Sequence, residues 1–164
     1  MSLLEVKGLN AYYGDSHILF DVALRVERNE VVALLGRNGA GKSTTLKSLM
    51  GVVAPREGSI VFDGAEIAGK KSHAIARALI RDPKIILLDE PFEGLAPVIV
   101  RDLVKACRDL ADAGQTIVLV EQNIAAALTL AQRAYFINNG HIAHEGPTSE
   151  IRARPQVLQR YLGV

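Results

Sequence analysis

The chain has 164 residues, of which 49% are hydrophobic, and its 19 basic residues are balanced by 18 acidic ones. This length is enough for one domain with a substantial core, and the balanced charge argues against nucleic acid as the main partner. A single cysteine excludes an intrachain disulfide framework, and the absence of a signal-peptide pattern or a membrane-length apolar run predicts a cytoplasmic protein.

The N-terminal part of the chain has the pattern of an antiparallel β layer. Apolar residues alternate strictly over residues 18–26, which is typical of a strand with one solvated face. Residues 3–6 and 59–62 also have the composition of strands, and Asp63-Gly64 after the second of these is a turn signal. We therefore expect a layer of antiparallel strands beside the segment described next.

A glycine-rich loop directly follows an apolar run at residues 31–35. Residues 36–43 read Gly-Arg-Asn-Gly-Ala-Gly-Lys-Ser, the G-x-x-x-x-G-K-S pattern of a phosphate-binding loop between a buried strand and a helix. Glycines let successive backbone N–H groups face one anion, and the N-terminus of the following helix adds partial positive charge. Lys42 can reach the β- and γ-phosphates, and the Ser43 hydroxyl can ligate Mg²⁺. The sequence therefore predicts nucleoside triphosphate binding, and the flanking strand and helix disfavour a mere glycine-rich turn.

Beyond residue 72 the pattern changes to alternating helices and strands. We expect helices at residues 72–81, 98–113 and 124–131, and near-continuous apolar strands at residues 85–88, 116–120 and 134–137. Such strands belong to a parallel sheet that is covered on both faces. The predicted fold class is therefore α/β, a P-loop NTPase core of mostly parallel sheet flanked by helices, with an N-terminal antiparallel β layer.

Two smaller features of this part are interpreted structurally. Cys107 falls on the same helical face as Leu103 and Leu110, so we expect a small core residue and not a nucleophile. Residues 145–151 resemble a turn followed by a helix start.

Two adjacent acids, Asp89 and Glu90, end the apolar strand at residues 85–88. Ligands bind at the carboxyl ends of strands in open α/β sheets, so these carboxylates are placed at a site. Because side chains alternate along a strand, the two cannot have the same role. We assign Asp89 to the Mg²⁺ shell and Glu90 to the base that polarises the attacking water. Without the phosphate loop, a solvated acidic strand end would explain them better.

Together these motifs resemble the ATP-binding subunit of ABC transporters, in particular the variety that serves branched-chain amino acid importers. The resemblance covers nearly the whole chain except residues 65–73. It rests on the phosphate loop, Leu-Leu-Asp-Glu-Pro at 87–91, Glu-Gly-Leu-Ala-Pro at 93–97, Leu-Val-Glu-Gln-Asn at 119–123, Asn-Gly-His-Ile at 139–142 and Tyr-Leu-Gly at 161–163. It implies that adenine stacks on Tyr13, and that Gln122 takes the place of the switch histidine of most ABC ATPases. Without the resemblance, Tyr13 would be interpreted as a surface or core residue and Gln122 as a cap at the strand edge.

The resemblance and the motifs together give a predicted site. The catalytic residues are Glu90 and Gln122, and the Mg²⁺ ligands are Ser43 and Asp89. The residues that bind ATP or ADP are Tyr13, Gly36, Asn38, Gly39, Ala40, Gly41, Lys42, Ser43 and Thr44. The partners that the resemblance implies are a second ATPase subunit and a membrane permease, to which family members attach at the cytoplasmic face of the inner membrane.

The chain departs from the family between Lys42 and Glu90. Family members carry there a helical subdomain with the Q-loop, the surface that couples to the permease, and the Ser-Gly-Gly signature. Here no glutamine lies in the interval, and Gly69-Lys70-Lys71 looks like a join to residues 72–79, which resemble the helix after the signature. We expect one domain over residues 1–164, made of the β layer with the phosphate loop (1–67), the join (68–71) and the α/β part (72–164).

The missing signature has a mechanistic consequence. In the family, two subunits hold each ATP between one phosphate loop and the partner's signature, whose serine contacts the γ-phosphate. Loss of stabilisation supplied in trans costs several powers of ten in rate. We therefore expect nucleotide binding with weak or absent hydrolysis, and impaired docking on a permease.

Two other classes of function stay open. One is a non-transport P-loop enzyme such as a small-molecule kinase, although residues 65–73 are too short to supply a lid and an acceptor pocket. The other is a regulatory module that holds nucleotide without turnover, which overlaps with the impaired ATPase.

Overall fold

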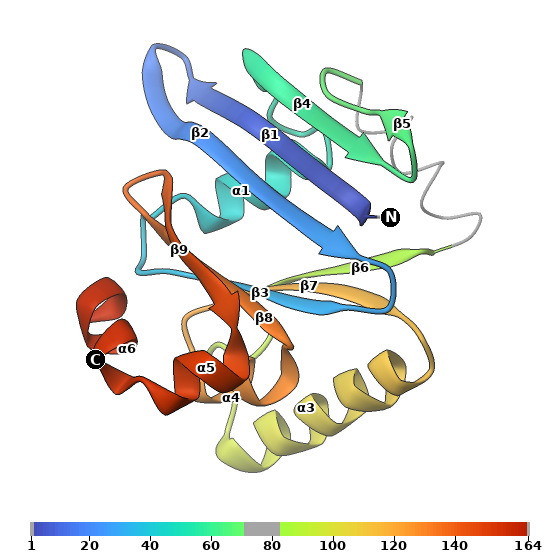
Figure 1. Cartoon of the computed structure of the whole chain (residues 1–164), viewed down its shortest axis with the longest axis vertical. Coiled ribbons are helices and arrows are strands. Elements are labelled where there is room, and N and C mark those ends of the chain that lie inside the picture. The colour runs from blue at the N-terminus through green and yellow to red at the C-terminus, as the bar shows by residue number, and fades with distance from the viewer. Residues whose placement is uncertain (1, 71–82, 164) are drawn as a thin grey trace.

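Two β-sheets, with helices packed against them, make up residues 2–70 and 83–163, the parts of the chain that the computed structural model describes (Figure 1). The helix expected at residues 72–81 lies outside the described residues, as does the end of the join at residue 71. The two sheets confirm the predicted α/β class with an N-terminal antiparallel layer.

The first sheet is antiparallel and has the strand order β2-β1-β4-β5. Its strands are β1 (Ser2–Tyr13), β2 (Ser16–Glu27), β4 (Glu57–Phe62) and β5 (Ala65–Glu66). The short strand expected at residues 3–6 is therefore wrong in length, because β1 continues through a bulge after Val6. Gly8 in this bulge has φ +60, a conformation that glycine adopts without strain, and this glycine interrupts the apolar pattern that sequence reading relies on.

The second sheet has the order β6-β7-β3-β8-β9 and is parallel except for its last strand. Its strands are β3 (Val31–Leu35), β6 (Ile85–Asp89), β7 (Thr116–Glu121), β8 (Arg133–Asn138) and β9 (His141–Pro147). β9 corrects the expected turn at residues 145–147, which instead pair with β8 in an antiparallel edge hairpin. Its side chains are alternately exposed and half-buried, so it lacks the apolar run that marked the buried strands.

Helices cover both faces of the second sheet. They are α1 (Lys42–Leu49), α3 (Pro97–Asp112), α4 (Ile124–Leu130), α5 (Thr148–Ala153) and α6 (Pro155–Leu162). In Figure 1, α1 lies between the two sheets, whereas α3 and α4 lie on the opposite side of the parallel sheet. The expected helices at 98–113 and 124–131 match α3 and α4 within one residue at each end.

Two apolar clusters use the alternate faces of the parallel strands. In β3, Val32 and Leu34 face the cluster shared with the antiparallel sheet and α1, whereas Ala33 and Leu35 face the cluster under the other helices. Cys107 is buried in this second cluster, and burial raises the pKa of its thiol, as expected for a core cysteine. Leu110, expected on the same buried face, is 44% exposed near the end of α3.

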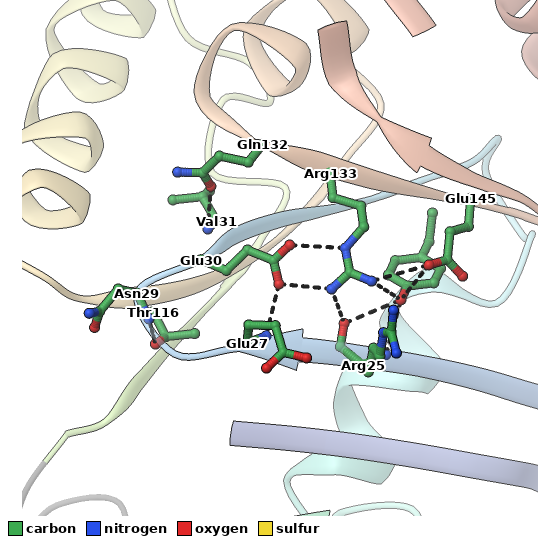
Figure 2. Close-up of polar contacts among 10 residues, drawn as sticks. Arg25, Glu27, Asn29, Glu30, Val31, Thr116, Gln132, Arg133 and Glu145 are labelled. Atoms are coloured by element: carbon green, nitrogen blue, oxygen red, sulfur yellow. Dashed lines mark hydrogen bonds and ion pairs between the residues drawn. The ribbon is translucent and has the colours of Figure 1, made fainter. Parts of the chain in front are cut away.

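Arg133, the first residue of β8, contacts residues of both sheets (Figure 2). It pairs with the start of the parallel strand β3, whereas the phosphate loop follows the end of β3. Its Nε and Nη2 donate to the two carboxylate oxygens of Glu30, at 2.9 and 2.8 Å. Nη2 also donates to the carbonyl of Arg25 in β2 at 2.8 Å, and Nη1 donates to the Tyr135 hydroxyl and to Glu145 in β9. One guanidinium thereby links β2, the start of β3, β8 and β9.

Replacing Arg133 with methionine should lower the free energy of unfolding by about 3 kcal/mol, because it leaves the half-buried Glu30 carboxylate without its cation. Urea unfolding at neutral pH measures the loss. The control is Arg101→Met on the exposed surface of α3, where we expect a change within about 0.5 kcal/mol. Equal stability of the two variants would contradict a structural role for this network.

Candidate phosphate-binding site

The phosphate loop runs from the end of β3 to the start of α1, as predicted. Gly36 lies so close to β8 that an added Cβ would be 2.5 Å from the carbonyl oxygen of Ile137. Gly39 and Gly41 have φ values of 77° and 109°, which side chains disfavour. Each glycine is therefore required by a close approach or by backbone conformation, and the loop leads directly into the N-terminus of α1.

Lys42 is only 4% exposed and lies folded against its own loop. Its Nζ donates to the carbonyls of Gly36 and Arg37, at 2.9 and 3.1 Å, and contacts Glu90 Oε1 at 3.1 Å. An ammonium group has three N–H donors, so each has an acceptor in this arrangement. The structure thus brings together Lys42 and Glu90, which the sequence placed at the same site from separate motifs.

Ser43 and Asp89, the two predicted Mg²⁺ ligands, also meet. The Ser43 hydroxyl donates to Asp89 Oδ1 at 3.2 Å, joining the start of α1 to the end of β6. Mg²⁺ is a hard cation that takes one or two protein oxygens together with phosphate oxygens and water, so a hydroxyl and a carboxylate fit it. No group of three or more His, Cys, Asp or Glu residues within 2–70 and 83–163 is arranged to hold a metal by itself.

Glu90 begins a turn after β6 and has a positive φ of 47°. Burial favours its neutral form, but hydrogen bonds with Lys42, Glu93 and Gln122 and the charge of Lys42 hold the pKa of Glu90 below its ordinary value. Glu90 is therefore ionised at neutral pH. The pKa of Glu93 moves the other way, because its carboxyl shares a hydrogen bond with the Glu90 carboxylate and feels its charge.

Tyr13 lies at the end of β1 and is 46% exposed. Its neighbour Tyr12 is already engaged, with the His17 ring stacked at 4.1 Å and the Arg56 guanidinium 4.2 Å from the ring centroid. Tyr13 is thus the more accessible of the two rings, although it does not line the cavity beside the phosphate loop.

A cavity of about 720 Å³ adjoins the phosphate loop. The predicted residues Gly36, Asn38, Ala40 and Gln122 line it. The other walls hold residues that sequence reasoning missed, Arg37, Ile124, Asn138, Asn139, Leu162 and Gly163. Asn139 has a positive φ at the β8–β9 turn. The Asn-Gly pair at 139 and 140 signals this turn, and it belongs to a stretch that carries the family resemblance, but neither signal assigns Asn139 to the site.

The fold and this loop define a P-loop nucleotide-binding protein. Residues 19–74 match the family model described as ABC transporter. The chain is 30% identical to the high-affinity branched-chain amino acid transport ATP-binding protein BraG of Pseudomonas aeruginosa, with 98% of this chain and 100% of BraG covered. The chain therefore belongs to the ABC transporter ATP-binding proteins.

A further relative is similar in sequence, and two solved structures have a similar fold. The lipopolysaccharide export system ATP-binding protein LptB of Escherichia coli K12 is 27% identical, covering 99% of this chain and 98% of LptB. Two crystal structures of ATP-binding cassettes from ABC transporters, one nucleotide-free and one in an ADP conformation, each superpose with a TM-score of 0.85 at 20% identity, covering both chains completely. A branched-chain amino acid transport protein and a lipopolysaccharide export protein are thus both similar to this chain, so similarity alone leaves the transported substrate open.

The alignment with BraG extends over 232 residues, whereas this chain has 164, so BraG contains residues that have no counterpart here. Within the described residues, no helix is both long enough and apolar enough to cross a membrane.

Proposed function

We propose that this chain is an ATP-binding subunit of the type that powers import of branched-chain amino acids, in a shortened form that binds Mg-ATP or ADP and hydrolyses ATP weakly or not at all. The observation that carries the proposal is the convergence of Lys42 and Ser43 with Asp89 and Glu90 at one edge of the parallel sheet.

Nucleotide binding would begin with an exchange of partners at Lys42. Because all three of its donors have protein acceptors, its ammonium must leave at least one of them for a β- or γ-phosphate oxygen. The remaining phosphate contacts would come from backbone N–H groups of Asn38 to Thr44 at the N-terminus of α1. Tyr13 would stack on the adenine. The Ser43 hydroxyl and the Asp89 carboxylate would hold Mg²⁺, which would neutralise phosphate charge.

Glu90 would act as the base for hydrolysis. Its ionised carboxylate would take a proton from water while the water oxygen attacks the γ-phosphorus and the bond to the β-phosphate oxygen breaks, which yields ADP and inorganic phosphate. Gln122, which lines the cavity beside the phosphate loop, would orient this water. The donors that a signature motif supplies on the far side of the γ-phosphate have no counterpart in this sequence, so the reaction would be slow.

The proposal that branched-chain amino acids are the transported substrate is based on sequence similarity. Glu-Gly-Leu-Ala-Pro at 93–97 and the glutamine at position 122 both match the branched-chain variety, and BraG is more similar to this chain than LptB is. A second subunit and a permease at the cytoplasmic face of the inner membrane would be the partners of an intact member, and the shortened interval would weaken both contacts.

Calorimetric titration with Mg-ATP and Mg-ADP, together with a steady-state phosphate-release assay, tests the proposal. We expect both nucleotides to bind and the release of phosphate to be at most barely above background. Absence of binding of either nucleotide would overturn the assignment. If the chain hydrolyses ATP at the rate of intact family members, and Glu90→Gln abolishes this activity, the proposal of impaired hydrolysis is wrong. The proposed nucleotide-binding site would still be supported.

A further inference from the structure

Glu121, the last residue of β7, is a buried carboxylate to which the proposed mechanism gives no role. Its side chain is only 2% exposed. Oε1 accepts the backbone N–H of Phe92 at 2.9 Å, while Oε2 accepts the N–H groups of Gln122 at 2.9 Å and of Asn123 at 2.8 Å. The two oxygens of one carboxylate therefore bind two different turns, each of which carries a residue of the proposed site.

The first of these turns carries Glu90. The Glu90 N–H donates to the Val120 carbonyl at 2.8 Å, and the Glu93 N–H closes the turn on the Glu90 carbonyl at 3.1 Å. Phe92, whose side chain is buried, points its N–H at Glu121. Glu121 and its neighbour Val120 thus anchor this turn to the end of β7, while Glu90 keeps its uncommon positive φ.

The second turn carries Gln122 and leads into α4. Asn123 caps this helix through its side-chain oxygen, which accepts the Ala126 N–H at 3.1 Å. The N–H groups of Gln122 and Asn123 donate to Glu121, so the start of this turn is fixed to Glu121 and its end is fixed to α4 by the Asn123 cap. Gln122 lines the cavity beside the phosphate loop, and a hydrogen bond with its side chain is one of the causes that lower the pKa of Glu90.

We infer that Glu121 is a positioning residue, which sets the spacing of Glu90 and Gln122 by binding the backbones of both turns with one carboxylate. The inference rests on the proposed function, because only a ligand with a γ-phosphate beside both residues would sense this spacing. Charge-assisted hydrogen bonds are about twice as strong as neutral ones, which suits a carboxylate that must hold three donors. Glutamine cannot replace it, because a glutamine side chain has only one acceptor oxygen. Its NH₂ group would point at the backbone N–H groups of one of the two turns, and two donors cannot form a hydrogen bond.

Glu121→Gln is the test, read out as the preference of the protein for ATP over ADP in calorimetry. We expect the affinity for Mg-ATP to fall about tenfold, the effect of losing one charge-assisted contact, while the affinity for Mg-ADP changes by less than about twofold. Glu150→Gln on the exposed surface of α5 removes the same charge and should leave both affinities unchanged. An unchanged preference in folded Glu121→Gln, or an equal loss for both nucleotides, overturns the inference.

A double-mutant comparison tests whether Glu121 positions Gln122 or only stabilises the fold in general. If Glu121 acts through Gln122, the loss of ATP affinity in Glu121→Gln combined with Gln122→Ala should be clearly smaller than the product of the two single losses. Fully multiplicative losses would overturn the inference.

If Glu121→Gln does not fold, Glu121→Asp keeps the charge but shortens the side chain by one methylene, and it should show the same selective loss of ATP affinity. An unaltered preference in that variant would overturn the inference. A wild-type protein that binds neither nucleotide would instead refute the proposed function, so the two failures are distinguishable.

Discussion

Replacing Lys42 with alanine is expected to weaken Mg-ATP binding about a hundredfold. A hydrogen bond to a charged group contributes about 1.5–3 kcal/mol, and a hundredfold change in affinity corresponds to about 2.7 kcal/mol. In the structure the Lys42 ammonium lies between the loop carbonyls and Glu90, at the N-terminus of α1 where phosphates would bind. Calorimetric titration of both proteins measures the difference.

Lys47→Ala provides the matched control for this variant. Lys47 is in the same helix and carries the same charge, but it is exposed in the last turn, away from the loop. We expect its ATP affinity to stay within about twofold of the wild type, because charges in solvent contribute little. Equal affinities of the two alanine variants would show that Lys42 does not contact the phosphates.

Inserting the helical subdomain of an intact family member after Gly69 is expected to raise ATP turnover about a thousandfold. The reason is that donors aimed at charge that develops in the transition state each contribute about 10²–10³ in rate, and the insert would supply them in trans. In the chain as it stands Lys42 contacts Glu90 and Ser43 contacts Asp89, so the groups of the proposed site are already close together. Phosphate release at saturating Mg-ATP measures the gain.

Two controls accompany the insertion. A glycine-serine insert of equal length should leave turnover at its original level, and Glu90→Gln in the chain with the subdomain should abolish the gain. If the extended chain folds and binds ATP but gains no turnover, the proposal that the missing signature limits hydrolysis is wrong.

The fold class could be predicted because its signals are local. Buried parallel strands are short apolar runs, and β3, β6, β7 and β8 all lie where such runs occur. The failures were strands without such runs. β1 crosses a bulge at Gly8, and β9 lies at the sheet edge with half its side chains in solvent, so neither has the periodicity of a buried strand.

The candidate site divides in the same way. The loop at residues 36–43 and the acids at 89 and 90 are recognisable because consecutive residues form each motif. Both motifs follow the carboxyl ends of strands, and the carboxyl ends of parallel strands lie at the same side of a sheet. The cavity walls at Asn138, Asn139, Leu162 and Gly163 could not be predicted, because β8 and α6 approach the loop only through long-range packing.

The sequence by itself thus determined a glycine-rich loop with the phosphate-binding pattern, a pair of acids at the end of a strand, and the short interval between these two motifs. Only the tertiary structure decided that Lys42 pairs with Glu90, that Ser43 meets Asp89, and that Glu121 holds two turns at once. The physical reason is distance along the chain. A motif of a few consecutive residues depends on the local backbone conformation alone. Contacts between residues tens of positions apart depend on the register of the strands, which decides which side chains point into the core and which point toward the site.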